Sequence, residues 1–179
     1  MTDFCLRRLS LTISRYATLY LRIALAAAFL TSVTDRFGIW GPPGTMNVAW
    51  GDMAHFTAYA ANLNPWFPNA VTPAVAWCVT AAETLLAVTL LLGFHARVAA
   101  QLSGWLLLAF AVGMTAATGV KSALNASVFS ASAGAFLLTA AESYPFSIDA
   151  YWRTKHLDTA RECIRSQLKN TCTTPLNRK

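Results

Sequence analysis

Long apolar stretches alternate with short polar ones along this chain. The apolar stretches cover residues 16–33, 71–92, 96–118 and 122–141. A helix rises about 1.5 Å per residue, so roughly twenty apolar residues cross the ~30 Å hydrocarbon layer of a bilayer. The pattern therefore predicts an all-α fold, a polytopic membrane four-helix bundle that occupies residues 1–145 and has these four stretches as its spans.

The segment between the first two spans, residues 34–70, is too long for a plain connector. It contains the turn sequence Gly-Pro-Pro-Gly at 41–44, and residues 50–63 can form a short helix with an apolar face. Its tryptophans are typical of a segment lying in the membrane interface. We expect an aromatic-rich loop or interfacial helix that caps one end of the bundle. A loop that is only anchored by its aromatic side chains, without a ligand, is the alternative.

Composition supports a membrane protein, because 55% of the residues are hydrophobic and only 12% are charged. The formal charge of +6 does not indicate nucleic acid, since the basic residues cluster before the first span, at the turn after the second, and after the fourth. Segment 34–70 has few of them. The positive-inside rule then places both termini in the cytoplasm and segment 34–70 outside.

Residues 146–179 are predicted to form a basic cytoplasmic tail. Within it, residues 149–168 have the pattern of an amphipathic helix that lies on the membrane surface.

Glu83 is the only carboxylate within the second apolar stretch. A charge at mid-membrane costs about 2.5–3.5 kcal/mol on insertion scales, so it is expected to face inward, either paired or protonated. Arg22 in the first span is the predicted partner, because the two residues lie about 9 Å and about 14 Å from the cytoplasmic end of their helices. In the alternative, Arg22 extends to the inner interface and Glu83 remains protonated.

Other polar side chains complete the candidate site for a ligand or proton. Gln101 could hydrogen-bond toward the level of Arg22 and Glu83. Asn125 and Ser127, beside Lys121 at the outer end of the fourth span, could line a polar pocket; in the alternative, the serines of this span serve helix packing. The remaining candidates lie in the cap: Trp50, Asp52 and His55. No dense cluster of metal ligands occurs, so no metal is predicted. The four cysteines include no C-x-x-C motif, which excludes the thiol relay of a disulfide-generating membrane oxidase. No residue is assigned as catalytic.

Several sequence pieces occur in an order that resembles the DoxX-like family of small four-helix bacterial membrane proteins. The pieces are DRFGIWGPPG at 35–44, AWGDMAHF at 49–56, ExxLxVxLLLGFxxRxAA at 83–100 and GVKSALNASVFSASAGA at 119–135. The resemblance implies a bacterial cytoplasmic (inner) membrane protein associated with redox complexes. It carries over to Arg22, Glu83, Arg97, Lys121 and the loop at 50–52. No cofactor-binding motif accompanies it, so a redox role needs a borrowed carrier, most naturally a membrane quinone.

Three functions remain open at this point. The first is a redox-associated subunit that binds a quinone or a similar lipophilic molecule; any enzymatic activity would then be that of a quinone-linked oxidoreductase subunit. The second is a non-enzymatic scaffold or assembly partner in which a buried ion pair fixes the arrangement of the helices. The third is a small carrier or lipid-binding protein. The expected partners are the lipid bilayer, together with a membrane-associated redox protein or further copies of the chain.

Overall fold

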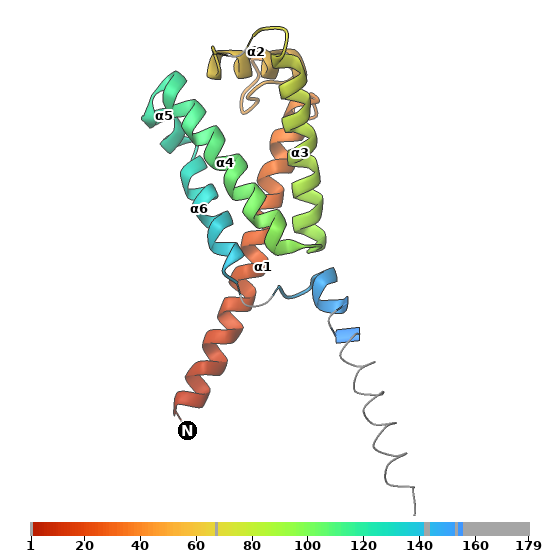
Figure 1. The fold of residues 1–179 in the computed structure, drawn as a ribbon, viewed down its shortest axis with the longest axis vertical. Helices are drawn as coiled ribbons and strands as arrows, with labels where there is room; N and C mark the ends of the chain where they lie inside the picture. The colour runs from red at the N-terminus through yellow and green to blue at the C-terminus, as the bar shows by residue number, and fades with distance from the viewer. Residues whose placement is uncertain (1, 67, 142–143, 153, 156–179) are drawn as a thin grey trace, which may run out of the picture.

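The computed structural model describes residues 2–66, 68–141, 144–152 and 154–155, and these residues form helices and loops without a strand (Figure 1). The helices are α1 (Thr2–Arg36), α2 (Met53–Leu63), α3 (Thr72–Leu92), α4 (Ala96–Thr118), α5 (Val120–Asn125) and α6 (Val128–Thr139). Three segments are long and apolar enough to cross a membrane: Ser14–Arg36, Thr72–Leu92 and Ala96–Thr118. The prediction of an all-α polytopic membrane protein with a helix between the first two spans is confirmed.

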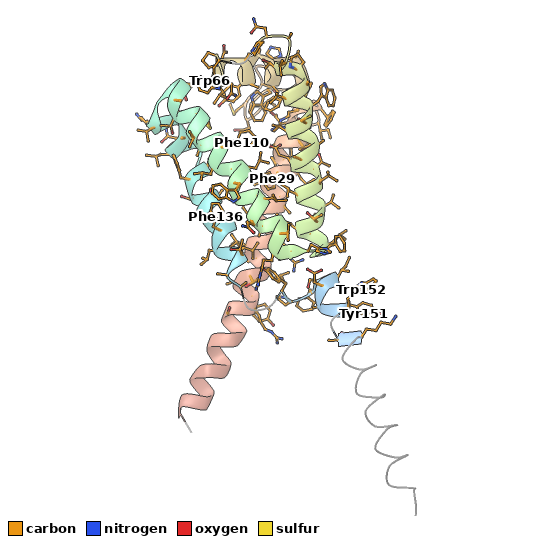
Figure 2. The ribbon with its side chains drawn as sticks, viewed as in Figure 1. Phe29, Trp66, Phe110, Phe136, Tyr151 and Trp152 are labelled. Atoms are coloured by element: carbon orange, nitrogen blue, oxygen red, sulfur yellow. The ribbon has the colours of Figure 1, made fainter. Side chains whose placement is uncertain are left out.

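The long helices form a bundle in which α1, α3, α4 and α6 each pack against two neighbours (Figure 1). Successive members run in opposite directions, as the short connection between α3 and α4 requires. Each contributes at least one fully buried position to the shared core, for example Ala26, Leu90, Ala100 and Ala135. Phe29 belongs to the same buried cluster, and Figure 2 shows it within the bundle. Small residues let the backbones approach closely, which is how membrane helices gain packing energy.

The predicted fourth span, 122–141, is two helices rather than one. α5 ends at Asn125, α6 begins at Val128, and Ser127 between them has a left-handed backbone with φ of 56°. Asn and Ser side chains compete with the helix for backbone hydrogen bonds, so this polar, small-residue sequence is a natural place for a helix to break. α6 alone rises only about 18 Å.

α2 lies across one end of the bundle, which we call the capped end (Figure 1). Asp52 starts the helix, since its side chain accepts a hydrogen bond from the His55 amide at 2.7 Å. Gly51 precedes it with φ of +74°, and a Cβ there would lie 2.5 Å from the Pro43 nitrogen. Only glycine fits this contact, which holds the Gly-Pro-Pro-Gly turn against the start of α2.

The opposite end, which we call the terminal end, is closed by residues 144–150. Asp149 accepts hydrogen bonds from the amides of His95 and Ala96, both at 3.0 Å, and so caps the start of α4. Its own amide donates to the Gly93 carbonyl at 3.3 Å. Most of the predicted amphipathic tail helix, from residue 156 on, lies outside the described residues.

Exposed aromatic side chains gather at both ends of the bundle. Phe37, Trp40 and Trp77 are exposed near the capped end, and Phe94 and Tyr151 near the terminal end. Along α3, about 25 Å of helix rise separates the level of Trp77 from that of Phe94. This spacing suits a bilayer core with an aromatic belt at each interface.

Candidate functional site

Glu83 is buried and paired with an arginine, but the arginine is Arg36 rather than Arg22. The Arg36 Nη2 donates a hydrogen bond to Glu83 Oε1 at 3.0 Å, and Oε2 lies 2.8 Å from the same nitrogen. The two side chains are 1% and 2% exposed. The expected Arg22–Glu83 pair was therefore wrong. We call Arg36 and Glu83 the buried pair.

The direction of helical side chains explains the exchange of partners. The Cα–Cβ bond leans toward the start of its helix. α1 runs toward the capped end, so Arg36 at its last residue points back into the bundle, whereas Arg22 points toward the terminal end. α3 runs the opposite way, so Glu83 leans toward the capped end and meets Arg36.

The guanidinium of Arg36 is surrounded by contacts. Its Nη1 donates to Thr80 Oγ1 at 2.8 Å, and its Nη2 also reaches Ser32 Oγ at 3.1 Å. Its Cζ lies 3.6 Å from the centre of the Phe56 ring and 5.3 Å from that of Trp50. A desolvated cation–π contact of this kind contributes up to about 2 kcal/mol. Because Phe56 and Trp50 belong to the cap, Arg36 fastens the cap to the spans.

Asp35 adds a second link between cap and bundle. Its Oδ2 accepts a hydrogen bond from the Trp50 amide at 2.8 Å, and the residue is 5% exposed. Within the described residues, three buried polar atoms lack a hydrogen-bond partner from the protein: Asp35 Oδ1, Arg36 Nε and Glu83 Oε2. The last is close to Nη2 but not aligned with one of its N–H bonds. All three atoms belong to the cluster of Asp35, Arg36 and Glu83. This cluster could therefore form further hydrogen bonds that the protein itself does not supply.

Arg22 forms a different kind of site at the terminal end. Its Nε and Nη2 donate to the carbonyls of Leu90 and Leu91 at 3.0 and 3.1 Å, and its Nη1 donates to the Pro145 carbonyl at 2.9 Å. Leu90 and Leu91 lie in the last turn of α3, where carbonyls lack helical partners and a positive charge is favourable. Arg22 thus joins the end of α3 to the segment that follows α6.

The outward side of α2 carries an exposed acid–imidazole pair beside an open hollow. His55 Nδ1 lies 2.8 and 2.9 Å from the two carboxylate oxygens of Asp52. The hydrogen bonds that the Asp52 carboxylate accepts from the His55 amide and from the His55 ring lower the pKa of Asp52 below its ordinary value. Burial raises the pKa of Tyr59, which lies against Trp50 with ring centres 5.8 Å apart. The hollow has a volume of about 410 Å³ and is lined by Ala49, Trp50, His55, Ala58, Tyr59 and Asn62.

The remaining predicted site residues do not join the buried pair. Gln101 is exposed, because the buried face of α4 follows Ala96, Ala99/Ala100 and Ser103/Gly104, and position 101 falls beside that stripe. The expected bond from Gln101 to the level of Glu83 is thus wrong. Lys121 and Asn125 are exposed on α5. Among the predicted cap residues, Trp50 lies against Arg36 of the buried pair and also lines the hollow. His55 lines the hollow as well, and Asp52 is bonded to His55.

Sequence reasoning passed over Arg36 and the hydroxyls that hold it. Asp35-Arg36 has the pattern of an ordinary helix end, and Thr80 is one of several threonines in the second span. One signal was available: Ser32 and Arg36 are four residues apart, and Thr80 and Glu83 are three apart, so each pair shares a helix face. Two polar faces on adjacent antiparallel helices are expected to meet.

No curated protein and no solved structure matches this chain. Residues 14–131 match the family described as methylamine utilisation protein MauE. The resemblance to the DoxX-like family was therefore wrong. The pieces behind it, such as Gly-Pro turns, an arginine at a span end and small-residue helices, are common needs of small membrane bundles and specify no single family. Since the match covers well over half of the 179 residues and includes the cap, α1 from residue 14 on, α3, α4 and α5, the chain belongs to the MauE family.

Proposed function

We propose that this multi-pass membrane protein is a non-catalytic accessory protein of methylamine utilisation, and that its cap docks a partner protein of that system. The family match supports the setting. The distribution of basic residues supports an orientation with the capped end outside the cytoplasm of a bacterial inner membrane and the termini inside. A membrane-associated redox protein is the partner that we expect.

The observation that carries this proposal is the enclosure of the buried pair. Arg36 is bonded to α1 through Ser32 and to α3 through Thr80 and Glu83, and it lies against rings of the cap. A pair held this way fixes the position of the cap on the spans. The open hollow beside Trp50 then becomes a preformed surface on a rigid support, which lowers the entropic cost of docking.

Matched substitutions on α2 test the docking surface. Ala58 lines the hollow and Ala54 does not, although both are exposed on the same short helix. In a methylamine-using host that lacks the native gene, the wild-type chain should restore growth on methylamine. Ala58→Trp, which fills the hollow, should abolish that growth, and Ala54→Trp should leave it unchanged. Equal growth of the two variants at equal membrane levels would contradict the proposal.

A second candidate function is a redox-associated subunit that binds a quinone. The observation in its favour is that Asp35 Oδ1, Arg36 Nε and Glu83 Oε2 form no hydrogen bond within the protein, although Oε2 lies in the ion pair; a ligand or a transferred proton would use these atoms. The two candidates differ in what they require of the pair. A positioning role needs only that the charges be matched or absent, whereas proton-coupled chemistry needs Glu83 itself.

The double variant Arg36→Met/Glu83→Met separates the two. Replacing a buried ion pair by apolar residues of similar size often preserves stability. If the double variant is present in the membrane at the wild-type level and restores growth, the pair has a positioning role. If it is equally abundant but fails to support growth, the proton-linked function is favoured.

A further inference from the structure

A second hollow shares no lining residue with the buried pair or with the first hollow. It has a volume of about 350 Å³ and lies between the segment that follows α2 and one face of α4. Figure 2 shows Trp66 of that segment at the capped end. Asn64 and Trp66 form its upper side, and Trp105, Ala109, Gly113 and Ala116 follow one another along α4. We call this feature the lateral groove.

The shape of the lateral groove suits a chain rather than a compact molecule. From Trp105 to Ala116 the helix rises about 17 Å, with small residues at 109, 113 and 116 on one face. The small side chains at these positions leave space along α4, and the larger side chains of Trp105 and Trp66 line the same groove. The nearest atom to a Cβ added at Gly113 would be Leu63 Cδ2 at 3.7 Å, so the groove beside it is open.

The position of the groove identifies the environment that fills it. α4 is long and apolar enough to span the membrane, and the groove lies along it. Trp105 at the deeper end is 58% exposed, as a lipid-facing side chain would be. The groove is therefore continuous with the surface that contacts the bilayer, and its occupant enters from the hydrocarbon layer rather than from water.

The polar side chains of the lateral groove lie at one end. Asn64 is the C-cap of α2, and its Nδ2 donates to the Ala60 carbonyl at 3.2 Å, which leaves its amide oxygen to accept. The Trp66 indole N–H is a donor at the same level. Phospholipids have this arrangement, with a polar headgroup at the interface and an acyl chain descending from it. A quinone ring has carbonyl oxygens on opposite sides, and the groove offers polar side chains on one side only.

We propose that the lateral groove binds one acyl chain of a bilayer phospholipid, with its headgroup beside Asn64 and Trp66. The bound chain would fill the space between the cap segment and α4. This site is separate from the docking surface on α2, so either proposal can fail without the other.

The test uses the full chain reconstituted into an equimolar mixture of phosphatidylethanolamine, phosphatidylglycerol and ubiquinone. The protein is then extracted into detergent and weighed by native mass spectrometry. Wild-type protein should retain one phospholipid per chain. Gly113→Leu places a side chain in the groove and should lower that occupancy about tenfold or more. Ala133→Leu, the same kind of enlargement at an exposed position on α6, should leave it unchanged.

Three results would overturn the proposal. The first is retention of ubiquinone in place of phospholipid. The second is equal phospholipid retention by wild type and Gly113→Leu. The third is a wild-type dimer without lipid that Gly113→Leu converts to a monomer, which would assign the groove to a second copy of the chain. Thermal unfolding of each variant in detergent distinguishes loss of lipid from loss of fold.

Discussion

Two arginines on one helix solve the same problem in different ways. Arg22 and Arg36 both lie on α1 and are 1% and 2% exposed. Arg36, at the capped end, faces the carboxylate of Glu83 and so belongs to a neutral pair. Arg22, at the terminal end, donates to three backbone carbonyls and forms no direct ion pair among the described residues.

The difference shows what each end requires. At the terminal end, the last carbonyls of α3 need donors in any case, and the fork of a guanidinium supplies several at fixed angles. Near the capped end, Arg36 faces the middle of α3, where the backbone carbonyls are already bonded within the helix. A buried cation at that position therefore needs a side-chain anion. Removing one partner should therefore be most damaging where a charge is left alone, and less so where only hydrogen bonds are lost.

The largest expected effect is that of Glu83→Met. The substitution leaves the charge of Arg36 buried without a partner, which costs about 3–5 kcal/mol. The midpoint of thermal unfolding in detergent should fall far more for this variant than for the double variant with Arg36→Met. A double variant as unstable as the sum of both single changes would mean that the two side chains are not coupled.

Arg22→Met should destabilise the terminal end by less, about 2–3 kcal/mol, because it strands carbonyls but no charge. Arg22→Lys keeps the charge and should recover only part of the loss, since one ammonium cannot match the geometry of three carbonyls. Amide exchange should rise selectively at the turn between α3 and α4. If Arg22→Lys were as stable as the wild type, the positive charge, and not the planar geometry of the guanidinium, would stabilise this end.

Much of this fold can be predicted from the sequence, while the pairing cannot. The lengths and hydropathy of α3 and α4 specify two spans, and a lone carboxylate in an apolar helix predicts that Glu83 is buried. Its partner depends on where side chains point, which helix depth alone does not give. Counting residues placed Arg22 and Glu83 only about 5 Å apart in depth, but their Cβ atoms lean toward opposite ends of the bundle, and Arg22 bonds the carbonyls of Leu90 and Leu91 instead.

The sequence pattern did not predict the break between α5 and α6. It also did not predict the correct family. The sequence around Ser127 contains Asn and Ser, which permit a helix to break without requiring it, so hydropathy alone does not distinguish one continuous helix from two. Similarly, an arginine at a span end and a Gly-Pro turn satisfy general needs of membrane bundles. Such features predict a fold class better than they predict a function.

Gly93→Ala tests how closely the parts of the terminal end approach. Gly93 has φ of +66°, and a Cβ there would collide with Ser147 Cβ and lie 2.5 Å from Arg22 Nη2. Ser147 or Arg22 has to move, so we expect a loss of about 1–2 kcal/mol from the left-handed backbone and the displaced contacts. The control is a double-mutant cycle with Ser147→Gly, which removes the side chain that the new Cβ would meet and keeps the same backbone at position 93. If the losses for Gly93→Ala and Ser147→Gly simply add in the double variant, the close contact between Gly93 and Ser147 contributes nothing.

The smallest effect is expected at the exposed pair of the capped end, Asp52 and His55. The pKa of Asp52 is lowered by the hydrogen bonds from the His55 amide and ring. A lowered pKa in the folded state means that this contribution to stability is present above the ordinary aspartate value, about 4, and is lost as the pH falls through the lower folded value. Hydrogen exchange of the His55 amide should therefore become faster, relative to its intrinsic rate, only in that acidic pH range.

The control variant is Asp52→Asn, because Asn remains a good helix cap but does not titrate. Exchange of the His55 amide in this variant should not become faster in the acidic range. An identical acid response in the variant would mean that the start of α2 is held by the contacts of Trp50 and Phe56 with Arg36, and that the surface pair contributes nothing to fixing the cap.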